Sequence, residues 1–295
     1  MVAVGQGGRR LLSRDGKTWT DEVQDATGDG DPGKHLLAAA SAGGLVVAVG
    51  GGCAGTSCTG RIVTFDGQRW TEATLPRGTS SLNAVAHGAG VWVAGGAAGS
   101  LLVSSDGKRW TAKSSLPAAV RALAFGMVGS TPMFVAVGDD SLRARSTDGE
   151  RWTRASAGIP GADGPVSLRA VAIGNGVAIA GGALGRRIRS TDGLAWTNPA
   201  AGGEDIHSIV EADGEFLAYA GKVVHLSSND GRTWSTQVLV NAPGHSVAAG
   251  TLAGARLFVG ASGAVTQTSG NGVVWSVSPA GVSGNRLAAF AFTGY

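Results

Sequence analysis

The sequence has few cysteines and few tyrosines, and it has neither a long apolar run nor a long run of basic residues. Of its 295 residues only two are cysteine and two are tyrosine, and charged residues make up 15%. No stretch of about 18 apolar residues occurs, so we expect no membrane-spanning segment. No run of Lys or Arg is longer than two residues, so the net charge of +3 does not indicate a nucleic-acid-binding surface.

Metal and cofactor motifs are also missing. The five histidines lie in different parts of the chain and form no pair at metal-ligand spacing: His35, His87, His207, His225 and His245. Asp25, Asp29 and Asp31 share one acidic loop but lack the spacing of a calcium-binding loop, so we interpret it as solvated. Glycine-rich strings such as residues 5–8 precede no expected helix and do not suggest a phosphate-binding loop. We therefore expect no metal and no cofactor.

Cys53 and Cys58 lie close together in the string CAGTSC. Without a further Cys or His nearby they cannot complete a tetrahedral zinc site. A disulfide within one loop is the favoured interpretation, with two free thiols as the alternative. A disulfide favours an extracytoplasmic location, periplasmic, secreted or surface-anchored, although no signal peptide is recognisable where Met1 leads into an expected strand.

One eight-residue phrase dominates the rest of the chain. SRDGKTWT at residues 13–20 returns as TFDGQRWT, SSDGKRWT, STDGERWT, STDGLAWT, SNDGRTWS and SGNGVVWS, at residues 64–71, 104–111, 146–153, 190–197, 228–235 and 269–276. The phrase predicts a tight hairpin, because Ser and Asp oxygens can accept backbone N–H groups and Gly tolerates a positive φ. The Trp then buries a large apolar surface at the start of the next strand. The Asp residues of the first six copies, and Asn271 at the same place in the seventh, cannot all serve one active site, so we assign this position a structural role.

This phrase resembles the Asp-box, or BNR, repeat of sialidases and of bacterial propeller proteins, including photosystem assembly factors of the Ycf48 kind. The usual form reads Ser-x-Asp-x-Gly-x-x-Trp, whereas here Gly directly follows the Asp, or Asn271 in the last copy. The resemblance covers the whole chain and implies a β-propeller architecture more specifically than it implies an activity.

The repeat length of about 40 residues predicts an all-β, seven-bladed β-propeller with four strands in each blade. Short apolar runs such as residues 1–5, 46–50 and 134–138 are expected as second strands, each preceded by an inner strand. The first repeat lacks that inner strand, and residues 286–295 follow the last turn without a partner. We therefore expect the N- and C-terminal strands to share one blade, and the chain to form a single monomeric domain over residues 1–295.

Two sets of polar residues are candidates for ligand binding. Aligning the third strands on the hairpin serine places Arg10, Arg61, Arg143, Arg187 and His225 at one position. Aligning the inner strands places Asn83, Arg121, Arg169 and His207 at their second position. Both positions are expected on the face that carries the outer-to-inner connections, around the channel mouth. They are either satisfied surface residues or an anion-binding face, because Arg presents a planar fork that matches carboxylate or phosphate.

The sequence thus favours a non-catalytic binding or scaffold propeller that recognises an acidic glycan or a protein partner through this arginine-rich face. The alternative is a sialidase-like glycoside hydrolase. The resemblance would then imply an arginine cluster, a Tyr nucleophile paired with Glu, and an Asp acid. Tyr219 falls in an expected second strand and Tyr295 is the last residue, and the Arg-Ile-Pro signature is missing. Glu211 and Glu215 could form a carboxylate pair, but a solvated turn is favoured.

Overall fold

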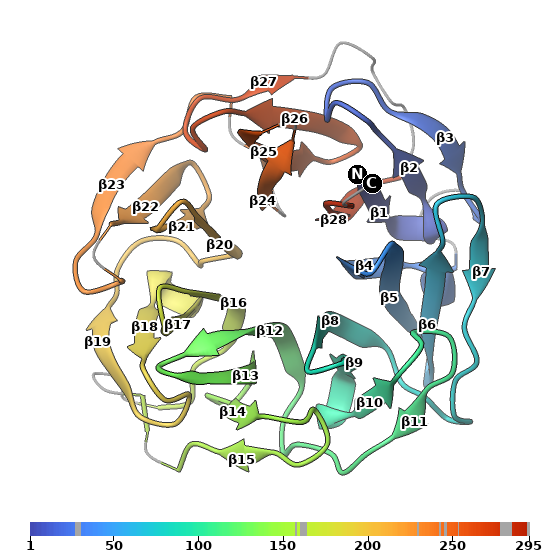
Figure 1. The fold of residues 1–295 in the computed structure, drawn as a ribbon, viewed down its shortest axis with the longest axis horizontal. Helices are drawn as coiled ribbons and strands as arrows, with labels where there is room; N and C mark the ends of the chain where they lie inside the picture. The colour runs from blue at the N-terminus through green and yellow to red at the C-terminus, as the bar shows by residue number, and fades with distance from the viewer. Residues whose placement is uncertain are drawn as a thin grey trace.

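The computed structural model shows seven four-stranded antiparallel sheets arranged in a ring around a central channel (Figure 1). It describes residues 1–26, 31–156, 158–159, 164–228, 230–241, 243–244, 247–252, 254–277 and 285–293. This part of the chain contains no α-helix, and its only helical elements are the 3-10 turns η1 (Gln6–Gly8), η2 (Pro32–Lys34), η3 (Ala97–Gly99) and η4 (Ala183–Gly185). The predicted all-β, seven-bladed propeller is therefore confirmed.

Each sheet is one blade, and its strands are given from the channel outward. Blade 1 is β28 (Leu287–Ala291), β1 (Val2–Gly5), β2 (Arg10–Leu12) and β3 (Thr20–Val23); blade 2 is β4 (Leu36–Ala42), β5 (Leu45–Ala54), β6 (Ser57–Phe65) and β7 (Trp70–Glu72). Blade 3 is β8 (Leu82–Gly88), β9 (Val91–Gly96), β10 (Leu101–Ser104) and β11 (Thr111–Ala112); blade 4 is β12 (Val120–Val128), β13 (Thr131–Gly138), β14 (Arg143–Ser146) and β15 (Thr153–Arg154). Blade 5 is β16 (Leu168–Gly174), β17 (Val177–Gly182), β18 (Arg187–Ser190) and β19 (Trp196–Ala200); blade 6 is β20 (Ser208–Ala212), β21 (Glu215–Ala220), β22 (Val223–Ser227) and β23 (Ser235–Val238). Blade 7 is β24 (Val247–Leu252), β25 (Ala255–Ser262), β26 (Val265–Ser269) and β27 (Ser276–Val277).

Blade 1 joins the two ends of the chain, as the sequence predicts. Strand β28 pairs antiparallel with β1, with Val2 opposite Ala291 and Val4 opposite Ala289. The C-terminal segment thus supplies the inner strand that the first repeat lacks, and no blade is left with an open edge at this seam.

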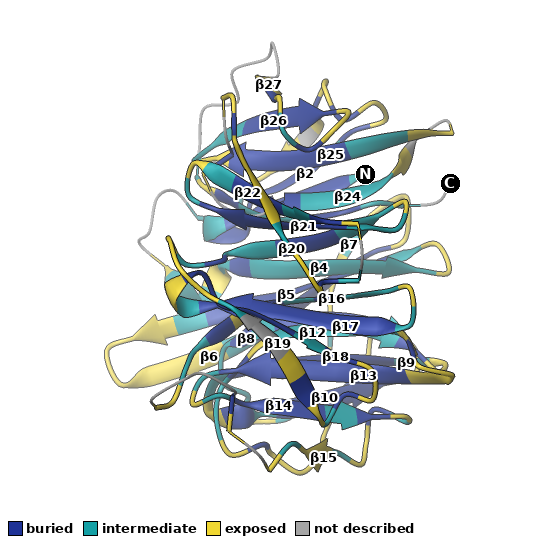
Figure 2. Cartoon of the chain, turned by 90° about the vertical axis from the view of Figure 1, so that its left-hand side faces the viewer, coloured by how far each residue is buried: buried dark blue, intermediate teal, exposed yellow. Residues whose placement is uncertain are grey.

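The hydrophobic core lies between neighbouring blades. The second strand β17 is buried along its whole length, and Figure 2 shows it in the dark colour of buried residues. The hairpin turns pack onto the second strands: Gly149 has a φ of 76°, and a Cβ atom there would lie 2.6 Å from a methyl group of Val93 in the preceding blade. Gly is required at this position both for the backbone conformation and for the close approach.

The repeated phrase forms the predicted hairpin turn through a defined set of hydrogen bonds. In the first copy the Ser13 hydroxyl accepts the Gly16 N–H at 2.8 Å, and Asp15 Oδ1 accepts the N–H groups of Lys17 and Thr18 at 2.8 and 2.7 Å. The Trp19 indole N–H donates to the Gly16 carbonyl at 3.1 Å. The serine bond recurs in the turns that begin at Ser104, Ser146, Ser190 and Ser269.

The other two turns differ in length from this pattern. In the sixth copy the hydroxyl that accepts the Gly231 N–H belongs to Ser227 rather than Ser228, so this turn is one residue longer. In the second copy Phe65, not Thr64, lies opposite Val46 at the place that Ser146 takes opposite Phe134. That turn is one residue shorter, and Phe65 packs on Trp70 with ring centroids 5.0 Å apart.

Candidate functional site

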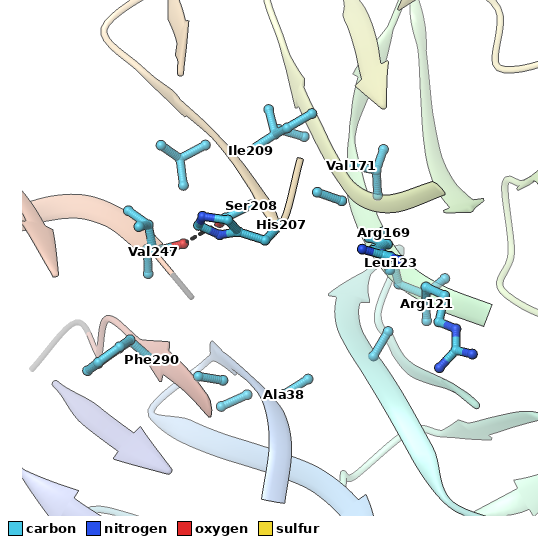
Figure 3. Close-up of a pocket in the computed structure, with 18 of the residues that line it drawn as sticks. Ala38, Arg121, Leu123, Arg169, Val171, His207, Ser208, Ile209, Val247 and Phe290 are labelled. Atoms are coloured by element: carbon cyan, nitrogen blue, oxygen red, sulfur yellow. Dashed lines mark hydrogen bonds between the residues drawn. The ribbon is translucent and has the colours of Figure 1, made fainter. Parts of the chain in front are cut away.

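A cavity of about 450 Å³ lies in the central channel and is lined by all seven inner strands (Figure 3). Its wall is built mainly from small apolar side chains, among them Ala84, Ala122, Ala170 and Ala289, together with the phenyl ring of Phe290. A volume of this size is within the usual range of ligand pockets. Since the wall is apolar, polar recognition depends on the few charged and amide side chains at the cavity.

β-Bulges place those polar side chains at the start of the inner strands. The pairing register shifts in four blades, leaving these residues without an opposite partner: Leu37, Asn83, Arg121 and Arg169. The same shift leaves Ala288 unpaired in blade 1. A bulged residue changes the direction of its side chain relative to the strand. The recurring bulge therefore turns one side chain from each of these blades toward the channel mouth.

A glycine at the end of the second strand makes each bulge possible. A Cβ atom on Gly138 would lie 1.8 Å from the carbonyl oxygen of Ala119, the residue just before β12. The following N–H, from Asp139, donates to that same carbonyl at 3.1 Å. Similarly close backbone approaches occur at Gly5, Gly50, Gly96 and Gly182. These glycines allow the start of the inner strand to lie directly against the second strand.

The four residues that the alignment of the inner strands selected all line the cavity in the structure. Asn83, Arg121, Arg169 and His207 come from the adjacent blades 3 to 6, and we call them the polar arc. On the other side of the mouth the corresponding residues are Leu37 and Ala288. The cavity mouth is therefore polar on one side, where it carries two arginines, and apolar on the other.

Each arginine of the polar arc is held by one carboxylate. The Nε and Nη2 atoms of Arg121 donate to Asp139 at 3.0 and 2.6 Å, and Arg169 pairs with Asp205. Asp139 also accepts the Ser167 hydroxyl, and Asp205 accepts the Leu184 N–H at 2.8 Å. The arginine side chains remain 45% and 47% exposed, so their N–H groups are accessible to a ligand as well.

Both carboxylates are held in their charged form. The bidentate contact with Arg121 lowers the pKa of Asp139, and the backbone N–H of Leu184 followed by the charge of Arg169 lowers the pKa of Asp205. At neutral pH the two arginines of the polar arc therefore form two ion pairs with Asp139 and Asp205. Exposed ion pairs of this kind contribute only about 0–1 kcal/mol each, so a ligand carboxylate can exchange with them at small cost.

The neutral members of the polar arc also have defined contacts. The Asn83 side-chain amide donates to the Val120 carbonyl at 2.9 Å, which links blade 3 to blade 4. The backbone N–H of His207 donates to the Tyr219 carbonyl at 3.0 Å, and Figure 3 shows its ring extending away from β20 beside Ser208 and Val247.

The five residues aligned on the third strands lie elsewhere, buried between blades, and they do not share one position. Arg10, Arg143 and Arg187 do correspond to one another. Arg61 and His225 do not, because the second turn is one residue shorter and the sixth one residue longer than the phrase suggests. A slip of one residue turns a side chain to the opposite face of its strand. The expectation that all five residues surround the channel mouth is therefore wrong. All five are buried between blades, and Arg61 and His225 also face the opposite side of their strands.

Arg10 and Arg61 belong to an ion network between blades 1 and 2. The carboxylate of Asp25 pairs with both guanidinium groups, at 2.5 Å from Arg10 and 2.7 Å from Arg61. Arg61 also pairs with Glu72, and Arg10 lies 5.4 Å above the ring of Trp70. Asp25 is thus a structural counter-ion rather than part of a solvated loop, a role that sequence spacing did not reveal.

Arg143, Arg187 and His225 are buried at other blade contacts. Arg143 Nε donates to the Ser141 carbonyl at 3.1 Å. Arg187 lies 5.4 Å above the ring of Trp234. His225 Nδ1 forms a 2.8 Å hydrogen bond with the Thr236 hydroxyl, and burial together with the Arg187 charge lowers its pKa to about 4.

The residues considered for a hydrolase have structural contacts. Tyr219 is fully buried, its hydroxyl donates to the Gly272 carbonyl at 3.0 Å, and burial raises its pKa. Glu211 Oε1 accepts the Gly214 N–H at 2.8 Å, and Glu215 lies 3.9 Å from Arg256. Tyr295 lies outside the described residues.

The cysteine-bearing insertion lengthens the hairpin of β5 and β6 beyond the neighbouring blades. Cys53 lies opposite Cys58 in the strand register, and a disulfide joins them. The side chains near its tip are exposed, and Figure 2 shows this hairpin projecting at the left. It flanks the same face as the polar arc, which we call the loop face because the outer-to-inner connections lie there.

Metal sites and membrane-spanning helices are not found within the ranges that the structure describes. No three His, Cys, Asp or Glu side chains there come together in a way that could hold a metal ion. No helix in the same ranges is both long and apolar enough to cross a membrane.

Comparison with known proteins supports the architecture. No family model matches the chain, and no curated protein matches it. Among solved structures, a computationally designed protein named Ika8 superposes with a TM-score of 0.62 at 15% identity, covering 99% of this chain and 87% of the other. A structure described as YCF48 bound to D1 peptide gives a TM-score of 0.59 at 18% identity, covering 83% of this chain and 81% of the other. At these identities the likeness shows the β-propeller fold.

Proposed function

We propose that this propeller is a non-catalytic binding module that takes an acidic segment of a partner protein at the mouth of its central cavity. The observation that carries the proposal is the polar arc: Arg121 and Arg169 lie on adjacent blades, both half exposed, at bulges that turn them toward the mouth. Arginine forks bind carboxylates in a bidentate manner, as Arg121 already does with Asp139.

The lining of the cavity favours a peptide over a glycan. A sugar requires many polar partners, whereas the channel wall beyond the polar arc is formed mostly by alanine, valine and isoleucine side chains together with Phe290. Apolar side chains of a peptide can contact this wall while its carboxylates pair with the arginines. The peptide named with the YCF48 structure supports a protein ligand by analogy of fold. An extracytoplasmic location is part of the proposal and is supported by the Cys53–Cys58 disulfide.

The test compares two charge-matched double variants. Arg121→Ala with Arg169→Ala removes the arginines of the polar arc. Arg69→Ala with Arg151→Ala removes two exposed arginines from hairpin turns, which lie on the opposite face. All proteins are assayed against an array of acidic peptides, the same peptides with amide side chains, and acidic glycans.

We expect the acidic peptides to bind the wild type and the turn variant equally, and to bind the polar-arc variant at least about tenfold more weakly, equivalent to 1.4 kcal/mol. Equal binding by both variants would refute the proposed site. Binding of acidic glycans without binding of peptides would refute the ligand class, and turnover of a chromogenic glycoside would favour the hydrolase alternative instead.

A further inference from the structure

A second anion-binding position is indicated by comparing two blade contacts within the same chain. Between blades 1 and 2, Arg10 lies 5.4 Å above the Trp70 ring. Between blades 5 and 6, Arg187 lies 5.4 Å above the Trp234 ring. Arg10 and Arg187 occupy the same strand position, and both are less than one-tenth exposed. The two contacts therefore present a buried guanidinium group in the same setting.

The counter-ion differs between the two contacts. Arg10 pairs with Asp25, which also pairs with Arg61 from the facing blade. Arg187 forms no ion pair with any residue that the structure describes, and its Nε and Nη1 atoms are buried without a hydrogen-bond partner there. Leaving a buried charge without a counter-ion costs several kcal/mol.

The sequence position that supplies Asp25 at the first contact carries a glycine at the second. Asp25 follows Trp19 by six residues, and its N–H donates to the Gly7 carbonyl at 2.9 Å. Gly202 follows Trp196 by six residues, and its N–H donates to the Leu184 carbonyl at 2.9 Å. Gly7 and Leu184 are themselves equivalent, each the middle residue of a 3-10 turn. The chain thus makes the same backbone hydrogen bond to the 3-10 turn at both contacts, but Gly202, which has a φ of 113°, brings no carboxylate.

Neighbouring acidic residues do not replace the missing carboxylate. Asp205 is bound to Arg169 and to the Leu184 N–H. The Glu204 carboxylate lies against Gly221. A Cβ atom on Gly202 would meet no heavy atom within 4 Å, so its surroundings are open to solvent on the loop face.

The facing blade adds a further donor. His225 comes from blade 6, is 6% exposed, and its Nε2 atom has no hydrogen-bond partner among the described residues. Because Nδ1 is engaged by the Thr236 hydroxyl, a tautomer that carries the proton on Nε2 presents an N–H group. The low pKa of His225 keeps the ring neutral, so one positive charge dominates this contact.

We propose that Arg187, with His225, binds a small monovalent anion between blades 5 and 6, either chloride or the carboxylate of a small acid, in the role that Asp25 has for Arg10. Such a ligand matches the single positive charge of Arg187. Its size is about that of the carboxylate group that Asp25 has and Gly202 lacks. The proposed site is separate from the polar arc and does not depend on the proposed function.

The test uses chloride and formate as probes. Thermal unfolding is followed over a sodium chloride series, with ionic strength held constant by a salt of a bulky sulfonate. The apparent midpoint of the wild type should rise along a saturation curve. The same rise is expected for Arg189→Leu, a matched loss of charge on the same strand, and it should vanish in Arg187→Leu.

Two further measurements keep the result interpretable if Arg187→Leu does not fold. Chloride-35 line broadening by the wild-type protein should be displaced by formate if the carboxylate and chloride share the site. Asp25→Gly should reproduce the glycine contact at blades 1 and 2 and make stability depend more strongly on formate. Absence of saturable broadening in the wild type, or an equal chloride response in Arg187→Leu, would overturn the proposal.

Discussion

Replacing Asp15 by alanine and by asparagine should separate the hydrogen bonds of the hairpin turn from its charge. Asp15 Oδ1 accepts two backbone N–H groups, from Lys17 and Thr18. Alanine removes both acceptors, as when a helix N-cap residue is lost, so we expect Asp15→Ala to lower the free energy of unfolding by about 1–2 kcal/mol. Asparagine keeps an acceptor oxygen, so Asp15→Asn should cost less than about half of that.

The chain contains its own control for this comparison. In the seventh turn Asn271 Oδ1 already accepts the N–H groups of Val273 and Val274, at 2.9 and 3.0 Å. The amide therefore supports the same geometry. Asn271→Asp should leave the turn intact and add a small stabilisation, because a charged acceptor makes the stronger hydrogen bond.

The charge should appear as a pH dependence. Hydrogen bonds, first that from the Thr18 N–H, lower the pKa of Asp15 to about 2 from its ordinary value of 3.8. A depressed carboxylate pKa contributes stability that is fully present above the ordinary value and is lost as the pH falls toward the folded value. The advantage of wild type over Asp15→Asn should therefore begin to shrink below about pH 4.

Urea unfolding followed by tryptophan fluorescence at neutral pH and at several acidic pH values provides the measurement. If Asp15→Asn were as destabilising as Asp15→Ala at neutral pH, the acceptor role assigned to the carboxylate would be wrong. An advantage over asparagine that stayed constant on acidification would refute the charge argument.

Two further predictions concern the bulge and the disulfide hairpin. Gly138→Ala forces a Cβ atom against the Ala119 carbonyl, so it should destabilise the fold by about 2–3 kcal/mol and displace Arg121; a urea midpoint and peptide affinity equal to wild type would contradict the bulge argument. Reducing the Cys53–Cys58 disulfide should accelerate proteolytic cleavage within residues 51–60 while the urea midpoint changes little, because the exposed hairpin tip can open without the blades; a large fall in the midpoint would show that the hairpin supports the core.

The sequence predicted the fold because each blade is specified locally. One short turn fixes the hairpin, and the turn recurs often enough to count the blades. The shared blade was also predictable, since the first repeat lacks a strand and residues 286–295 supply one. In the turns that begin at Ser13, Ser104, Ser146, Ser190 and Ser269, the glycine N–H makes the expected hydrogen bond to the serine hydroxyl.

The candidate site was predicted less completely, for two physical reasons. Strand side chains alternate between faces, so one residue more before Gly231 and one fewer before Gly67 moved His225 and Arg61 to the opposite side of their strands. Counter-ions come from distant connections: Asp205 lies 36 residues after Arg169 in the sequence. The bulges left a local signal in the glycine that ends each of several second strands, but only the structure connected that glycine with the direction of Arg121.

The pairing of β28 with β1 has a consequence for how the protein is made. Val2 pairs with Ala291, so all the strands of blades 2 to 7 lie between the two paired strands in the sequence. During synthesis β1 leaves the ribosome with its inner edge unprotected until blades 2 to 7 have followed. Nascent or truncated chains should therefore be the most prone to aggregate and the most in need of chaperones.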